Sequence, residues 1–105
     1  MSPRPTLAAV YEDSLYTRRA FSDRESIFDY LVERSPKGAL SVRRAIVGAI
    51  RSLAEFPQLG RSTDVADVRE LTVPRYPYKV YYRIDSNEIW VVHIRDARRR
   101  PWLEP

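Results

Sequence analysis

The stretch Tyr78-Lys79-Val80-Tyr81-Tyr82-Arg83-Ile84 leads through Asp85-Ser86-Asn87 into Glu88-Ile89-Trp90-Val91-Val92-His93-Ile94-Arg95. Both long pieces are rich in aromatic and β-branched residues, which favour extended strands. The three polar residues between them are typical of a tight turn. This stretch therefore predicts an antiparallel β-hairpin that occupies much of the C-terminal half of the chain.

Besides the hairpin, two further strands are expected, one before the helical region and one between that region and the hairpin. Arg69-Glu70-Leu71-Thr72-Val73 alternates between polar and apolar residues until Pro74, and would complete a three-strand antiparallel meander with the hairpin. A first strand is expected within residues 7–16, which hold several apolar and aromatic residues. Residues 1–6 are interpreted as a loose leader, because Pro3 and Pro5 block regular structure.

Two helices are predicted between these strands. Thr17 can cap the first helix, which should end near Arg34, and Ser35-Pro36 is a start signal for the second. Pro57 should end that second, long amphipathic helix. Because the link at Ser35-Pro36 is short, the two helices should form an antiparallel hairpin. We therefore expect one α+β domain over residues 1–105: an N-terminal strand, an antiparallel helix hairpin, then a three-strand antiparallel meander. The helix hairpin would cover one sheet face and leave the other partly open.

Composition narrows the classes of function. The chain has 105 residues and 18 Lys plus Arg against 14 Asp plus Glu, so its net charge is +4. An acidic partner, either nucleic acid or an acidic protein segment, is therefore plausible. The chain has no cysteine, one histidine and 3 glycines, so we expect no disulfide, no metal, no phosphate-binding loop and no cofactor. No apolar run approaches the roughly 18 residues that a membrane helix needs, and no secretory signal is evident.

Several motifs in order resemble the RelE/ParE superfamily of toxins from bacterial type II toxin–antitoxin modules. More narrowly, they look like the ParE branch, whose members are often called plasmid-stabilisation proteins. The resemblance covers about residues 15–102 and is carried by Ile27-Phe28-Asp29-Tyr30-Leu31, Leu53-Ala54-Glu55-Phe56-Pro57-Gln58-Leu59-Gly60-Arg61, Arg69-Glu70-Leu71, Tyr76-Pro77-Tyr78-Lys79-Val80-Tyr81-Tyr82-Arg83-Ile84 and Arg98-Arg99-Arg100-Pro101-Trp102. It implies a cytoplasmic toxin that a small cognate antitoxin neutralises.

The superfamily holds two activities. Members similar to ParE inhibit DNA gyrase, and members similar to RelE cut mRNA on the ribosome without a metal. For the nuclease, the resemblance implies catalytic roles for Lys79, Arg83, His93 and Arg98. The nuclease pattern is incomplete, because Lys79 stands where that branch tends to have arginine and Glu70 has the wrong charge for a phosphate contact. We therefore favour gyrase inhibition by binding, with the nuclease as the alternative; a family member that has lost toxicity is a third reading.

The resemblance and the charge pattern also place the binding residues. The C-terminal basic cluster is expected to contact the target through Arg98, Arg99, Arg100 and Trp102. The antitoxin is expected to contact the helix hairpin and the loop after it, through Phe21, Phe28, Tyr30, Phe56, Arg61 and Arg69. Regular alternation along the last strand would put His93 on the face of Ile89 and Val91, opposite Trp90.

Overall fold

The structure is a computed structural model that describes residues 7–11 and 14–98 of the chain. The elements follow in the order β1 (Leu7–Tyr11), β2 (Ser14–Thr17), α1 (Arg18–Arg34), α2 (Pro36–Glu55), β3 (Arg61–Ser62), β4 (Arg69–Thr72), β5 (Tyr78–Asp85) and β6 (Glu88–Asp96). The strands form one sheet in the order β1-β2-β6-β5-β4-β3. The predicted α+β class and the β4–β5–β6 meander are confirmed.

The two helices begin and end where their capping residues predict. The Thr17 side chain accepts a hydrogen bond from the Ala20 backbone N–H at 3.2 Å and so caps α1. Ser35 ends α1 and caps α2, because its N–H donates to the Leu31 carbonyl while its hydroxyl accepts from Gly38. Pro57 follows the last residues of α2. No helix in the described part of the chain is long and apolar enough to cross a bilayer.

The N-terminal region differs from the single strand that was expected. β1 and β2 form an antiparallel pair, and β2 then runs parallel to β6, so the sheet is mixed rather than purely antiparallel. The two-residue strand β3 extends the other edge by pairing with β4. Its shortness explains why no periodic pattern predicted it, because two residues cannot show an alternation.

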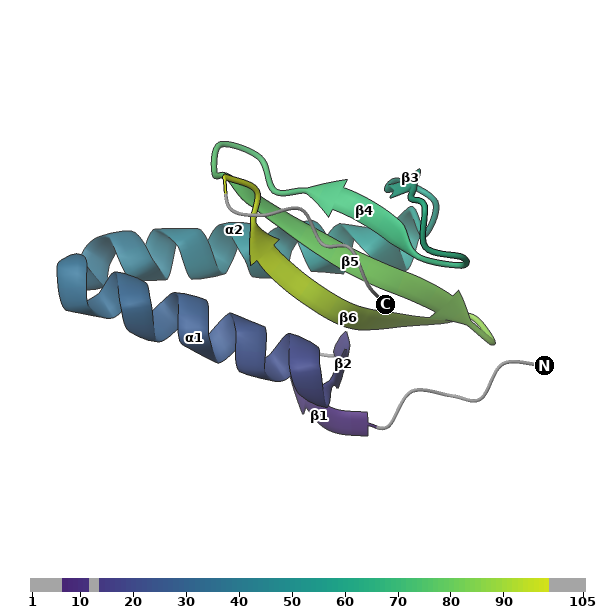
Figure 1. The fold of residues 1–105 in the computed structure, drawn as a ribbon, viewed down its shortest axis with the longest axis horizontal. Helices are drawn as coiled ribbons and strands as arrows, with labels where there is room; N and C mark the ends of the chain where they lie inside the picture. Colours follow the sequence, from purple (N-terminus) through teal and green to yellow (C-terminus); the bar gives the residue numbers. More distant parts are fainter. Residues whose placement is uncertain (1–6, 12–13, 99–105) are drawn as a thin grey trace.

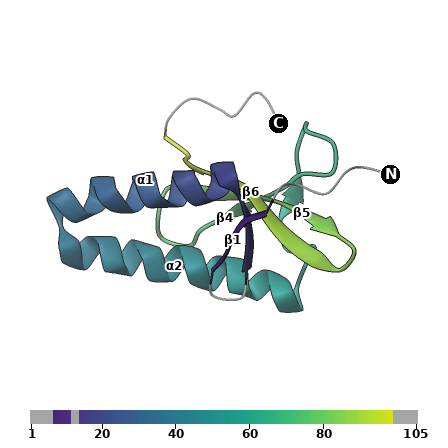
Figure 2. The ribbon, with the colours of Figure 1, turned by 90° about the horizontal axis from the view of Figure 1, so that it is seen from below.

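The hydrophobic core lies between α2 and one face of the sheet. α2 passes behind the strands, whereas α1 lies beside β6 (Figures 1 and 2). The helix hairpin therefore covers one face and also flanks one edge, which refines the expected single layer. Buried core side chains come from α2, from the strands and from the start of α1: Tyr16, Ala20, Val42, Ile46, Ile50, Leu53, Leu71, Val73, Tyr78, Val80, Tyr82, Val91 and Ile94.

A register shift in β6 corrects the expected orientation of His93. Tyr82 lies opposite Val91 while Tyr81 lies opposite His93, so Val92 is an extra residue in β6. One extra residue moves every following side chain to the other face. The side chain of His93 therefore lies on the same sheet face as that of Trp90, and the side chain of Val91 lies on the other face. Strict alternation predicted the reverse. The same shift returns Ile94 to the core, where it is 2% exposed.

The loop after α2 is held by one buried tyrosine. The Tyr82 hydroxyl donates to the Pro57 carbonyl at 2.7 Å and accepts from the Gly60 N–H at 2.9 Å. Gly60 lies so close to Tyr82 that an added Cβ would come within 2.7 Å of its ring. This contact fixes where the chain leaves α2 and enters β3, and so sets the position of Arg61.

Candidate functional site

The sheet face turned away from α2 carries three of the polar side chains singled out in the sequence, Lys79, Arg83 and His93. Strand register puts eight residues on it, which we call the open face: Glu70, Thr72, Lys79, Tyr81, Arg83, Trp90, His93 and Arg95. Residues that lie directly opposite each other on neighbouring strands share a face, and their side chains are close enough to interact. The open face can therefore be followed row by row across the strands.

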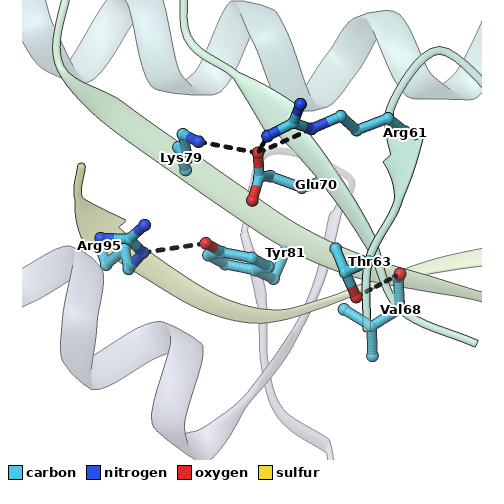
Figure 3. A network of polar contacts seen from close by, with 7 residues as sticks. All are labelled: Arg61, Thr63, Val68, Glu70, Lys79, Tyr81 and Arg95. Carbon is cyan, nitrogen blue, oxygen red and sulfur yellow. Dashed lines mark hydrogen bonds and ion pairs between the residues drawn. The ribbon is translucent and has the colours of Figure 1, made fainter. Parts of the chain in front are cut away.

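Glu70 is the centre of a cation cluster on the open face. Its Oε1 accepts from Lys79 Nζ at 2.9 Å and from both Nε and a terminal nitrogen of Arg61, at 3.2 and 2.9 Å (Figure 3). The Glu70 side chain is 10% exposed and that of Lys79 is 21% exposed. Burial acts to raise the pKa of Glu70, but the hydrogen bonds from Lys79 and Arg61 outweigh it and hold the pKa below its usual value.

Tyr81 connects this cluster to the next strand. Its hydroxyl accepts from Arg95 Nε at 2.9 Å (Figure 3) and also helps to lower the pKa of Glu70. Its ring stacks on the His93 ring, with centroids 5.5 Å apart and planes inclined by 23°. Tyr81, on β5, thus links a carboxylate from β4 with a guanidinium and an imidazole from β6.

His93 is held by a carboxylate from α1. Its Nδ1 lies 2.6 Å from Asp23 Oδ2, and the same oxygen accepts from the Ile94 backbone N–H at 3.1 Å. His93 is 7% exposed. Asp23 therefore joins α1 to the part of β6 that lies beyond its pairing with β2. A shallow hollow of about 350 Å³ between α1 and β6 is lined by this pair together with Ser26, Tyr30 and Arg95.

Arg83 and Trp90 form the next row of the open face toward the hairpin turn. Unlike Glu70, Tyr81 and His93, each has a buried donor atom without a hydrogen-bond partner among the described residues. They lie directly opposite each other on β5 and β6. The Arg83 Nε and the Trp90 Nε1 are both buried and have no hydrogen-bond partner in the structure. The sequence singled out Arg83 as a candidate nuclease residue but gave Trp90 no role.

The target-contact residues are only partly described. Arg98 donates to both carboxylate oxygens of Asp96, at 3.1 and 2.8 Å, and these contacts raise its pKa above the usual value for arginine. Its guanidinium side chain is 70% exposed. Arg99, Arg100 and Trp102 lie outside the described residues, so their contribution to target binding stays a prediction.

The residues predicted to bind an antitoxin do not form one surface. Phe21 packs against the core, and Phe28 lies in a small hollow between α1 and α2. Tyr30 is 45% exposed on α1 under the Arg34 guanidinium, and Phe56 is 56% exposed at the end of α2.

The two arginines of that set are engaged close to the loop after α2. Arg61 pairs with Glu70, and Arg69 donates to the Gly60 carbonyl at 2.7 Å. In addition, an apolar groove of about 760 Å³ runs between the last turns of α2 and the turn of the β5–β6 hairpin, and Ile84 lines it with 40% of its surface exposed.

Strand register brings Lys79, Arg83 and His93 onto one face, but it does not place them together. Lys79 and Arg83 are four residues apart on β5, which corresponds to about 13 Å between their Cα atoms. Asp23 and Tyr81 hold His93, and the sequence predicted neither of these contacts. Asp23 carried no local signal, because its partner lies 70 residues away. Tyr81 could not be predicted as a neighbour of His93 either, because uninterrupted register pairs it with Val92, and only the extra residue in β6 brings His93 opposite it.

This arrangement of strands, helix hairpin and basic face agrees with a family match over most of the chain. A family model described as "ParE toxin of type II toxin-antitoxin system, parDE" matches residues 15–101. The chain belongs to the ParE toxin family. The predicted membership is therefore confirmed, and this ParE-family chain is a toxin of a type II toxin–antitoxin system.

Curated relatives and a solved structure agree with this membership. The chain is 36% identical over 85 residues to "Toxin RelE2" of Caulobacter vibrioides, which covers 81% of this chain and 94% of the relative. It is 31% identical to "Putative toxin Y4kP" of Sinorhizobium fredii, over 81% of this chain and 88% of the relative. A solved structure described as "Chromosomal ParDE TA system from P. aeruginosa" matches with a TM-score of 0.67 and 32% identity, over 75% of this chain and 88% of that one. As a ParE-family toxin, the protein has a cognate antitoxin as its partner.

Proposed function

We propose that this toxin acts by binding DNA gyrase in the cytoplasm, without a reaction of its own, until its antitoxin binds it. The observation that supports this mechanism is the carboxylate at the centre of the open face. A ribonuclease that works without a metal needs cations free to hold a phosphate and to neutralise developing charge. Lys79 is instead paired with Glu70 at 2.9 Å, on a face where Glu70 also holds Arg61.

The other nuclease candidates are engaged in a similar way. Arg98 is bound by both oxygens of Asp96, so a phosphate would have to displace a carboxylate there. His93 is buried between Tyr81 and Asp23 and has little access to a substrate proton. These contacts disfavour catalysis and leave protein binding as the function that the described surface supports best.

An mRNA endonuclease of the RelE type is the second candidate. Two observations favour it: Arg83 has no ion-pair partner within the described residues, and the curated relatives include toxins named RelE2 and RelE1. In this alternative, Lys79, Arg83, His93 and Arg98 would hold the RNA and move protons during cleavage. Lys79 would first have to leave Glu70.

Pulse labelling after induction in a bacterial host distinguishes these mechanisms. Thymidine and methionine incorporation would be followed side by side. We expect DNA synthesis to stop first, with a purified-gyrase supercoiling assay then inhibited by the protein. Protein synthesis that stops first, with mRNA cut within codons, would replace the proposal by the nuclease. Normal growth with abundant soluble protein would identify a family member that has lost toxicity.

A pair of variants tests the predicted target contact. Arg98→Ala combined with Arg99→Ala should abolish growth arrest while antitoxin binding is retained, because the predicted target contact is basic. Arg18→Ala combined with Arg44→Ala is the matched control, since both residues are exposed on the helices and the charge change is the same. Full toxicity of the Arg98/Arg99 variant would contradict the proposed contact.

A further inference from the structure

Arg83 and Trp90 are a cross-strand pair with two unused donors. The Nε of Arg83 and the Nε1 of Trp90 are buried, and neither makes a hydrogen bond in the structure. Trp90 as a whole is 4% exposed. Buried polar groups are nearly always hydrogen-bonded, because an unpaired one loses its water without compensation. Two such groups in one row of the sheet therefore call for an outside partner.

The chemistry of the two atoms defines that partner. An indole N–H and a guanidinium N–H are donors only, so the missing group must be an acceptor. The pair lies directly opposite on β5 and β6, where side chains of such a pair approach to about 5 Å at Cβ. A carboxylate has two oxygens at a spacing that can serve both donors, and the fixed charge of arginine favours an anion.

We infer that Arg83 and Trp90 form a binding subsite for one carboxylate of a protein partner, and that this partner is the antitoxin. That the partner is the antitoxin rests on the proposed function. That the partner supplies a carboxylate rests on the two unpaired donors.

The surroundings of the pair favour a single carboxylate over a nucleic acid. Along the same face, Glu70 lies toward one side, and Asp85 and Glu88 lie opposite each other toward the hairpin turn. A phosphate backbone would bring several negative charges against these carboxylates, whereas an isolated acidic side chain brings only one.

The burial of both donor atoms favours a long-lived complex. A desolvated, hydrogen-bonded charge pair acts mainly on the dissociation rate, while exposed charges act mainly on association. An antitoxin has to stay bound for as long as growth continues, so a buried carboxylate contact suits it.

A binding experiment tests the subsite with the protein encoded by the adjoining reading frame. Arg83→Met and Trp90→Phe each remove one donor and keep most of the side-chain volume. Each should raise Kd about tenfold, which corresponds to about 1.4 kcal/mol. Because both donors serve one carboxylate, the double variant should lose less than the product of the single losses. Arg44→Met, on the exposed side of α2, is the control and should bind as the unchanged protein does.

Nuclear magnetic resonance of the indole N–H gives a readout of partner binding in the unchanged protein itself. The chain has only two tryptophans, so the Trp90 signal of the unchanged protein is readily assigned by Trp90→Phe. Binding of the partner should move this proton downfield and protect it from exchange. An unchanged indole signal in a formed complex, or single variants that bind as the unchanged protein does, would overturn the inference.

Sodium acetate separates failure of the subsite from failure of the proposed function. If the adjoining protein does not bind at all, both the proposed function and the identification of the partner as the antitoxin are wrong. Acetate should still shift the Trp90 indole signal saturably, and Arg83→Met should abolish that shift. A shift caused by a single-stranded oligonucleotide and not by acetate would assign the pair to nucleic acid and overturn the carboxylate.

Discussion

Replacing Glu70 by glutamine should turn the open face into a surface that binds nucleic acid. Glu70 holds Lys79 and Arg61 at 2.9 Å each and is itself only 10% exposed. Glutamine keeps the shape but removes the negative charge that occupies both cations. Lys79 and Arg61 then become available to contact phosphates on a face that already contains Arg83 and Arg95.

The expected change in the salt dependence of nucleic-acid binding follows from counterion release. Each phosphate neutralised on a single strand steepens the dependence of log K on log salt by about 0.7, so two freed cations add up to about 1.4 to the slope. Between 50 and 200 mM salt, this slope makes the affinity of the variant fall about sevenfold more than that of the unchanged protein.

Fluorescence anisotropy with a short labelled RNA, measured across this salt range, checks the prediction. Glu55→Gln is the matched control, since it removes the same charge from an exposed position at the end of α2. We expect the Glu55 variant to follow the unchanged protein. A Glu70→Gln slope equal to that of Glu55→Gln would refute the reasoning, because it would show that Glu70 does not withhold these cations from phosphate.

The remaining predictions concern stability. Tyr82→Phe should cost about 2 kcal/mol in urea denaturation, because the buried Gly60 N–H and the Pro57 carbonyl lose their shared partner. Gly60→Ala should cost about 1–3 kcal/mol, since its Cβ would lie 2.7 Å from the Tyr82 ring and 2.9 Å from the Glu70 carbonyl. Gly48→Ala in α2, with nothing within 4 Å, should instead stabilise by about 0.5–1 kcal/mol. Because the folded pKa of Glu70 is lowered, its contribution should be complete above its ordinary value of 4.5 and fade as the pH falls further. The stability difference from Glu70→Gln should therefore be larger at pH 7 than near pH 3, and equal differences would contradict this assignment.

Local signals predicted the helices and the central hairpin well. Thr17, Ser35 and Pro57 act on their own neighbours, so the ends of α1 and α2 could be placed from the sequence. The parallel contact of β2 with β6 could not, because it depends on where the end of the chain returns. The turn at Ser86 and Asn87 has positive φ at both residues, as expected for a tight hairpin turn.

The candidate site was harder to predict for the same reason. Lys79, Arg83 and His93 were singled out by residue type, and their strands were correct. The extra residue at Val92 is invisible in the sequence, because a bulge is defined only by the partner strand. The carboxylates that hold these side chains are also long-range partners: Glu70 reaches Lys79 from the preceding strand, and Asp23 reaches His93 from α1.

The contact between Asp23 and the Ile94 N–H has a consequence for how this protein survives alone. Among the described residues, β2 pairs with β6 only near Trp90 and Val91, so the next part of that strand has no strand neighbour on this side. A bare edge can recruit a strand from another molecule and start a fibre. The Asp23 carboxylate accepts a hydrogen bond from the Ile94 N–H on this edge of β6 and brings α1 against the strand. A strand from another molecule therefore cannot pair with β6 at this position. Newly made toxin thus carries its own protection against self-association at this edge before any partner reaches it.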